Sequence, residues 1–267
     1  GGRLENVTTL VSRDQLTIGR GGSVQADLLS NRAEGEVHIA GSLTGDLENY
    51  SQASVTLDEG QISGDVSNSG LLAGSGAIGG DVTNRGTLRV DDLLTVGGLG
   101  NTGQVEIGGD DTLRSASDIS NDGTISLSGL LEITSVDALL TNNGGGRIAL
   151  DGGRIEAGLN NEADARLEVS GTASIAGDLE NRGIIDKSNG AASLTVEGGT
   201  FHNWGRVTGS GAGRLAIHSA QIILESGSYV DGGHVDLIGE VLNGGELDFS
   251  RATELNGNLD NAESGLA

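Results

Sequence analysis

Short runs of alternating apolar and polar residues recur along the whole chain, and each run follows an asparagine. After Asn84, Leu88 and Val90 would share one face of a β-strand, and the polar residues beside them would share the other. The same pair, four and six residues after an Asn, recurs as Val105 and Ile107, Ile125 and Leu127, and Leu247 and Phe249. A second group places the pair six and eight residues after an Asn: Val37 and Ile39, Val55 and Leu57, Ile148 and Leu150, and Leu167 and Val169. Because the insertion is of even length, the apolar face is kept.

A pair made of an apolar residue and, two positions later, an asparagine returns about every twenty residues. The asparagines are Asn6, Asn31, Asn49, Asn68, Asn84, Asn101, Asn121, Asn142, Asn161, Asn181, Asn203, Asn243 and Asn261. The long interval between Asn203 and Asn243 is interpreted as two coils, with Glu225 in place of the missing Asn. A fixed period of this length is typical of a solenoid.

Glycine follows the asparagine by two positions in most repeats: Gly70, Gly86, Gly103, Gly123, Gly144, Gly183, Gly205 and Gly245. This pattern predicts tight corners between strands, because glycine and asparagine tolerate positive φ. The Asn amides would bond the corner and stack on one another as a structural ladder. The ladder is expected at Asn31, Asn49, Asn68, Asn84, Asn101, Asn121, Asn142, Asn161, Asn181, Asn203, Asn243 and Asn261.

The fold class predicted is all-β: a right-handed parallel β-helix (β-solenoid) with about 20 residues per coil and about 13 coils. Residues 1–267 are expected to form a single elongated domain, and because both ends fall inside the repeat we expect a segment of a longer or polymerising protein. Lys187 interrupts the pattern at an inward position. We expect a loop at Asp186–Gly190 there, with the strand resuming at Leu194 and Val196.

Composition narrows the functional classes. The chain has no Cys, so packing alone must hold it, and the absence of thiols suits an exported protein. Its net charge is −23 and Lys187 is the single lysine, which argues against binding to nucleic acid phosphates. No stretch is long and apolar enough for a transmembrane helix.

The repeat resembles that of the filamentous-haemagglutinin-like adhesins of two-partner secretion and related autotransporter passengers. Residues Val82–Val90 (VTNRGTLRV) and Ile119–Leu127 (ISNDGTISL) carry the resemblance most clearly, and it extends over nearly the whole chain. It implies a β-helical fibre at the cell surface of a Gram-negative bacterium, serving adhesion, biofilm formation or toxin display. The Asn-Pro motifs of the family's secretion domain are missing, since the chain has no proline.

Candidate chemistry is sparse. An acidic residue lies three positions before several ladder asparagines, at Asp46, Asp65, Asp81, Asp118 and Asp178. Stacked at ~4.8 Å, these carboxylates would repel one another, and Ca²⁺ would relieve the repulsion. A solvated acidic edge without metal is the alternative that we favour.

His202, Trp204, Tyr229 and His234 form a candidate contact surface.

The function predicted is a non-catalytic, extracellular, structural β-solenoid that forms a fibre or an adhesin stalk. Its expected partners are further copies of itself, stacked head to tail or side by side, and a cell or host surface. Two alternatives remain open. One is a module that binds a host receptor or another surface, and the other is a polysaccharide-degrading β-helix enzyme, for which carboxylates are plentiful but aromatic rings are few.

Overall fold

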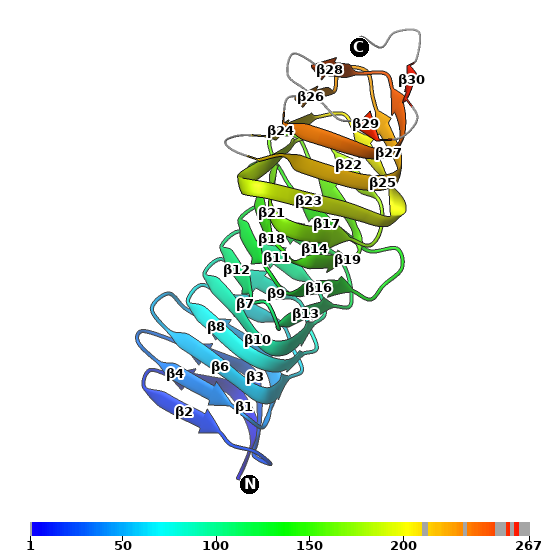
Figure 1. Cartoon of the computed structure of the whole chain (residues 1–267). Helices are drawn as coiled ribbons and strands as arrows, with labels where there is room; N and C mark the ends of the chain where they lie inside the picture. The colour runs from blue at the N-terminus through cyan, green and yellow to red at the C-terminus, as the bar shows by residue number, and fades with distance from the viewer. Residues whose placement is uncertain (1, 210–212, 232–233, 249–254, 257–258, 262–267) are drawn as a thin grey trace. The chain divides into compact units, whose positions relative to one another are not determined.

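The computed structural model describes residues 2–209, 213–231, 234–248, 255–256 and 259–261, with only the main chain at positions 188, 189, 255, 256 and 261. The chain folds as two compact units. Unit 1 comprises Gly1–Ile125 and Leu131–Val136, and unit 2 comprises Ser126–Leu130 and Asp137–Ala267. Both are parallel β-solenoids. The chain as a whole has about 13 turns with a spacing of about 19 residues, which confirms the predicted fold class. No helix occurs among the described residues, so none there could span a membrane (Figure 1).

The strands of unit 1 are short and follow one another closely. They are β1 (Arg3–Ser12), β2 (Gln15–Ile18), β3 (Ser23–Asn31), β4 (Glu36–Ile39), β5 (Ser42–Asn49), β6 (Ser54–Ile62), β7 (Val66–Asn68), β8 (Leu71–Ile78), β9 (Val82–Asn84), β10 (Thr87–Val96), β11 (Leu99–Asn101), β12 (Gln104–Ile107), β13 (Thr112–Ser115) and β14 (Ile119–Asn121). Two further strands, β15 (Thr124–Leu127) and β16 (Leu130–Ile133), contribute residues to both units.

Unit 2 continues the same alternation of strands and corners. Its strands are β17 (Leu139–Asn142), β18 (Arg147–Asp151), β19 (Arg154–Glu156), β20 (Gly158–Asn161), β21 (Arg166–Ile175), β22 (Leu179–Asn181), β23 (Ile184–Asn203), β24 (Arg206–Gly209), β25 (Leu215–Leu224), β26 (Tyr229–Asp231), β27 (Val235–Asn243), β28 (Glu246–Asp248), β29 (Leu255–Asn256) and β30 (Leu259–Asn261).

Each coil pairs with the coils before and after it in parallel register. In unit 1 the first ladder of strands runs through β2, β4, β6, β8, β10 and β12. A second ladder includes the later residues of β8 and β10 and strand β13. A third runs from the end of β3 through β5, β7, β9, β11 and β14 and carries the asparagines. Parallel pairing in one register places equivalent residues of successive coils directly over one another, so that one repeat position becomes one column.

The interior of each unit is the stack of apolar residues that the alternation predicts. The described inward pairs are almost fully buried: Leu88 and Val90, Val105 and Ile107, Val37 and Ile39, and Val55 and Leu57 in unit 1, and Ile148 and Leu150 and Leu167 and Val169 in unit 2. Phe249 lies outside the described residues. Both the shorter and the longer corner therefore keep the same face inward, as an even insertion requires.

The loop expected at Asp186–Gly190 does not form, and that prediction is wrong. Strand β23 runs without a break through these residues, and Lys187 lies in register between Val169 and Gly209. The Lys187 side chain is fully buried. Pairing with β21 on one side and β24 on the other holds the strand, so the alternation set by Ile185 carries Lys187 inward despite its charge. The extra residues are absorbed after Lys187, where the register with β21 shifts.

Candidate functional site: the asparagine ladder and its corners

The asparagines of unit 1 form a continuous ladder of side-chain hydrogen bonds. Each Nδ2 donates to the Oδ1 of the asparagine in the next coil. The donor–acceptor distances are 3.0 Å from Asn31 to Asn49, 2.7 Å from Asn49 to Asn68, 2.8 Å from Asn68 to Asn84, 2.8 Å from Asn84 to Asn101 and 2.7 Å from Asn101 to Asn121. These side chains are 0–1% exposed. Buried polar groups are costly unless they are satisfied, and here each amide satisfies its neighbour.

Each ladder amide also joins backbone to backbone. The Nδ2 of Asn84 donates to the carbonyl of Gln104, which begins a strand of the next coil, at 2.9 Å. It also lies 3.3 Å from the carbonyl of Gly86 in its own corner. One side chain therefore holds its corner and fixes the height of the coil that follows, because an amide nitrogen carries two hydrogens. The repeated Asn is best explained as a device for coil stacking.

Unit 2 carries the same ladder with one interruption. Nδ2–Oδ1 distances are 2.8 Å from Asn142 to Asn161, 2.7 Å from Asn161 to Asn181 and 2.7 Å from Asn181 to Asn203. The next position in the column is Leu224, which is paired with Asn203 on one side and Asn243 on the other.

Placing Glu225 in the ladder was therefore wrong by one residue. Leu224 is 1% exposed and fills the column with an apolar side chain, while Glu225 begins the following corner. The Oδ1 of Asn243 accepts a hydrogen bond from the Gly245 amide at 3.1 Å. The side chain of Asn261 lies outside the described residues.

The first described coil also departs from the sequence interpretation. Asn31 pairs in register with Ser12, not with Asn6, and Asn6 is exposed with φ of 58°. The Ser12 hydroxyl donates to the carbonyl of Asp14 at 3.1 Å. The Oδ1 of Asn31 is buried without a hydrogen-bond partner. The apolar-x-Asn pattern alone could not distinguish Asn6 from a ladder member, because register depends on the partner strand.

The acidic column bonds to backbone amides. The Oδ1 of Asp46 accepts a hydrogen bond from the Asp65 amide at 2.9 Å, and Asp65 accepts one from the Asp81 amide at 2.9 Å. In unit 2, Asp178 accepts one from Thr200 at 2.8 Å. Asp118, like the other four, is exposed. Across the described residues, no three His, Cys, Asp or Glu side chains come together as a metal site would require.

The candidate contact residues separate into two groups in unit 2. His202 and Trp204 lie edge to face with ring centroids 5.1 Å apart, and the Arg182 guanidinium lies 4.7 Å from the Trp204 ring centroid. All three are exposed or half-buried. Arg182 also pairs with Glu180 at 3.0 Å. This corner presents an aromatic ring framed by charge, which suits a contact with another molecule.

Tyr229 and His234 form the second group. Arg206 lies 5.1 Å from the Tyr229 ring centroid, and the Tyr229 hydroxyl is 3.3 Å from the Asp248 carboxylate. Burial raises the pKa of Tyr229, and the nearby Asp248 carboxylate raises it further. His234 Nδ1 lies 3.2 Å from Asp231 Oδ2. The two groups lie on different ladders of strands. His202 belongs to the ladder that carries the asparagines, whereas Tyr229 belongs to the ladder in which it pairs with Arg206.

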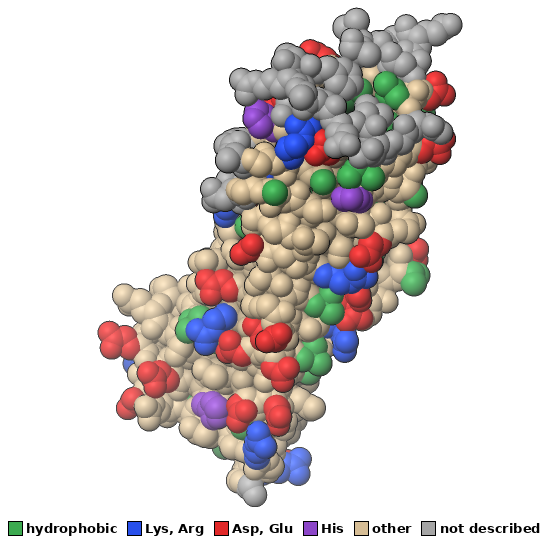
Figure 2. Space-filling model, in the orientation of Figure 1, with side chains coloured by type: hydrophobic (Ala, Val, Ile, Leu, Met, Phe, Trp, Pro, Cys, Tyr) green, Lys and Arg blue, Asp and Glu red, His purple; other side chains and the backbone are tan. Residues whose placement is uncertain are grey.

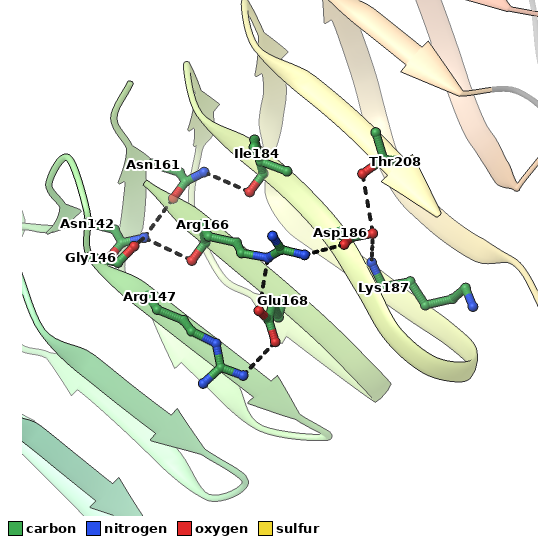
Figure 3. A network of polar contacts seen from close by, with 10 residues as sticks. All are labelled: Asn142, Gly146, Arg147, Asn161, Arg166, Glu168, Ile184, Asp186, Lys187 and Thr208. Carbon is green, nitrogen blue, oxygen red and sulfur yellow. Dashed lines mark hydrogen bonds and ion pairs between the residues drawn. The ribbon is translucent and has the colours of Figure 1, made fainter. Parts of the chain in front are cut away.

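A chain of ion pairs that the sequence analysis missed crosses four coils of unit 2 (Figure 3). Arg147 contacts Glu168 at 2.5 Å, and Glu168 lies 2.9 Å from Arg166. Arg166 reaches Asp186 at 2.5 Å. The Thr208 hydroxyl is 3.3 Å from Asp186 and continues the chain. Strand alternation places these residues on the outward-facing side of their strands, but it does not show which of them meet across coils, because that depends on the register between strands.

The Arg147 hydrogen bond is the main reason why the pKa of Glu168 lies below its ordinary value, and the Arg166 charge adds to the effect. Acidic side chains are spread over the visible face, many of them beside Lys or Arg (Figure 2). Some of the ion pairs join residues of one strand, such as Arg89 and Asp91, and others join successive coils, such as Arg114 and Glu132.

A scan of protein-family models gives no match to this chain, and a search of curated proteins finds no relative. The parallel β-solenoid is therefore established by the structure alone. The resemblance to haemagglutinin-like adhesins remains an expectation from the repeat.

Proposed function

We propose that this chain is a non-catalytic structural segment of an extracellular fibre or adhesin stalk. The observation that carries the proposal is the asparagine ladder, in which one buried side chain per coil is committed to joining that coil to the next. The buried apolar residues pack against those of neighbouring coils, and aspartates such as Asp46 accept hydrogen bonds from the backbone of the next coil. Side chains used in this way specify a repeating scaffold.

The location and assembly proposed follow from composition and repeat. An acidic chain without cysteine suits export, and the repeat resembles that of surface fibres of Gram-negative bacteria. The proposed partners are other copies of the same chain, stacked head to tail or side by side, and a cell or host surface. A strongly negative net charge keeps such scaffolds soluble and limits non-specific binding to anionic surfaces.

A second candidate, receptor binding, is favoured by one observation. Trp204 is half-buried at a corner of unit 2, with Arg182 over its ring and His202 at its edge. Tryptophan and arginine are both enriched where proteins bind partners. A stalk carrying such a corner would combine both roles.

Two measurements on native material test the proposal. Immunogold labelling of intact cells should place the protein at the surface, and negative-stain microscopy of the purified chain should show filaments or extended particles. Labelling confined to the cytosol would refute the extracellular role. Release of oligosaccharides from acidic polysaccharides, abolished by replacing a surface carboxylate, would refute the non-catalytic assignment. A Trp204→Ala variant that binds host cells as well as the unchanged protein would remove the second candidate.

A further inference from the structure

Asparagine followed by glycine is chemically labile. The backbone nitrogen of the glycine attacks the Asn side-chain carbonyl carbon, ammonia leaves, and a cyclic succinimide forms. Water then opens the succinimide to aspartate or isoaspartate, so that atoms balance with water as the co-reactant. Glycine favours the attack because no Cβ obstructs it. The pair occurs as Asn143–Gly144, Asn189–Gly190, Asn243–Gly244 and Asn256–Gly257.

Asn143 lies in an open corner of unit 2. It begins a four-residue turn that is closed by a hydrogen bond from the Gly146 amide to the Asn143 carbonyl at 2.8 Å. Gly144 and Gly145 are both exposed, and Gly145 has φ of 89°. The Gly145 amide donates to the Asp164 carbonyl of the next coil at 3.3 Å, but Gly144, whose nitrogen makes the attack, is exposed and has no side chain to obstruct it.

Asn243 has the same following residue but opposite surroundings. Its side chain is 0% exposed, and its Oδ1 accepts a hydrogen bond from the Gly245 amide at 3.1 Å. The attacking atom is engaged as well, because the Gly244 amide donates to the Leu224 carbonyl at 2.7 Å. Both reacting groups are therefore held in the ladder geometry.

We propose that Asn143 is a site of spontaneous deamidation in the folded protein and that the fold protects Asn243. The reaction converts a neutral corner into one bearing a carboxylate. Isoaspartate also lengthens the backbone by one carbon, directly after the ladder residue Asn142. The Nδ2 of Asn142 donates to the Gly146 carbonyl at 3.2 Å, so the change strains the corner that this amide holds (Figure 3).

A matched variant comes from equivalent corners. The turns Tyr50–Ala53 and Glu162–Ala165 are closed by the same kind of hydrogen bond, and their second residues are Ser51 and Ala163. The backbone at the position of Gly144 is therefore compatible with a side chain, and the Cβ, 3.0 Å from the Ala163 carbonyl oxygen, requires only a small shift of that neighbour. Gly144→Ser keeps Asn143 and the turn but places a Cβ beside the attacking nitrogen.

The intact protein is incubated in warm, mildly alkaline buffer, and a second sample is incubated in the same buffer with concentrated urea. Peptide mapping with mass spectrometry then locates the converted residues, and enzymatic methylation measures isoaspartate. Under native conditions, aspartate and isoaspartate should accumulate at position 143 while position 243 stays unchanged. In urea both should convert at similar rates, and Gly144→Ser should slow conversion at 143 several-fold in both arms. Equal conversion of both positions under native conditions would overturn the proposal, as would conversion of Asn143 in urea only.

Discussion

Replacing one ladder asparagine by leucine isolates the contribution of the ladder to coil stacking. Asn84 is the clearest position, because it lies in β9 in the interior of unit 1 and is 0% exposed. Asn84→Leu keeps a buried side chain in place but removes both the amide donor and the carbonyl acceptor. The natural Leu224 shows that the column admits leucine sterically.

The magnitude follows from the bonds that disappear. Asn84 donates to Asn101 at 2.8 Å and to the Gln104 carbonyl at 2.9 Å, and it accepts from Asn68 at 2.8 Å. At about 1 kcal/mol of net stability for each bond, the loss is about 3 kcal/mol. Burial of the added apolar surface offsets part of this, leaving a net destabilisation of about 2 kcal/mol.

Urea unfolding followed by circular dichroism measures the change, and hydrogen exchange on peptides of each coil shows where it acts, because solenoids need not unfold in one step. Thr83→Val is the control, since Thr83 lies beside Asn84 on the exposed face and its replacement should change stability by less than about 0.5 kcal/mol. If Asn84→Leu matched Thr83→Val in stability and exchange, the ladder would contribute nothing and the reasoning would fail.

Three further outcomes are expected. Leu224→Asn should complete the broken column and raise stability by about 1 kcal/mol, seen as a higher urea midpoint at an unchanged slope; a lower midpoint would show that the apolar contacts of Leu224 matter more. Gly74→Ala should lower the free energy of unfolding by at least about 2 kcal/mol, because Gly74 has φ of 119° and a Cβ there would lie 1.9 Å from the Leu57 carbonyl oxygen. Gly100→Ala is the control and should leave stability unchanged in the same titration, because a Cβ at Gly100 would have no atom within 4 Å. The pKa of Glu168 is lowered in the folded state. Its ion pairs therefore stabilise the fold fully above the ordinary carboxyl pKa, and this contribution is lost as pH falls through the folded-state pKa. Glu168→Gln should remove this part of the acid sensitivity in thermal melts across pH, and an unchanged pH profile would contradict the assignment.

The repeat and the alternation predicted the parallel β-solenoid, because one pattern repeated in many coils averages out local exceptions. The exceptions are where the prediction failed. Leu224 occupies the column that was assigned to Glu225, and Ser12 the one assigned to Asn6. The spacing of the repeat therefore does not identify the residue that occupies a column in every coil, whereas hydrogen bonding to the neighbouring strands does.

Lys187 shows a second limit. Its charge argued for a loop, yet the strand continues and the side chain is buried. Local preference was overruled by pairing on both sides of the strand. The ion-pair network of unit 2 was missed for a different reason: its members are separated by about one coil, so their proximity appears only once the coils are stacked in register.

The central claim is that a buried column of asparagine side chains joins successive coils. Hydrogen exchange of the Asn side-chain amides, resolved by NMR, tests it most directly. We predict slow exchange for the ladder amides, with protection lost first around Asn84 in the Asn84→Leu variant. Exchange of every Asn side-chain amide at the rate of a solvated amide would contradict the ladder and the scaffold role proposed from it.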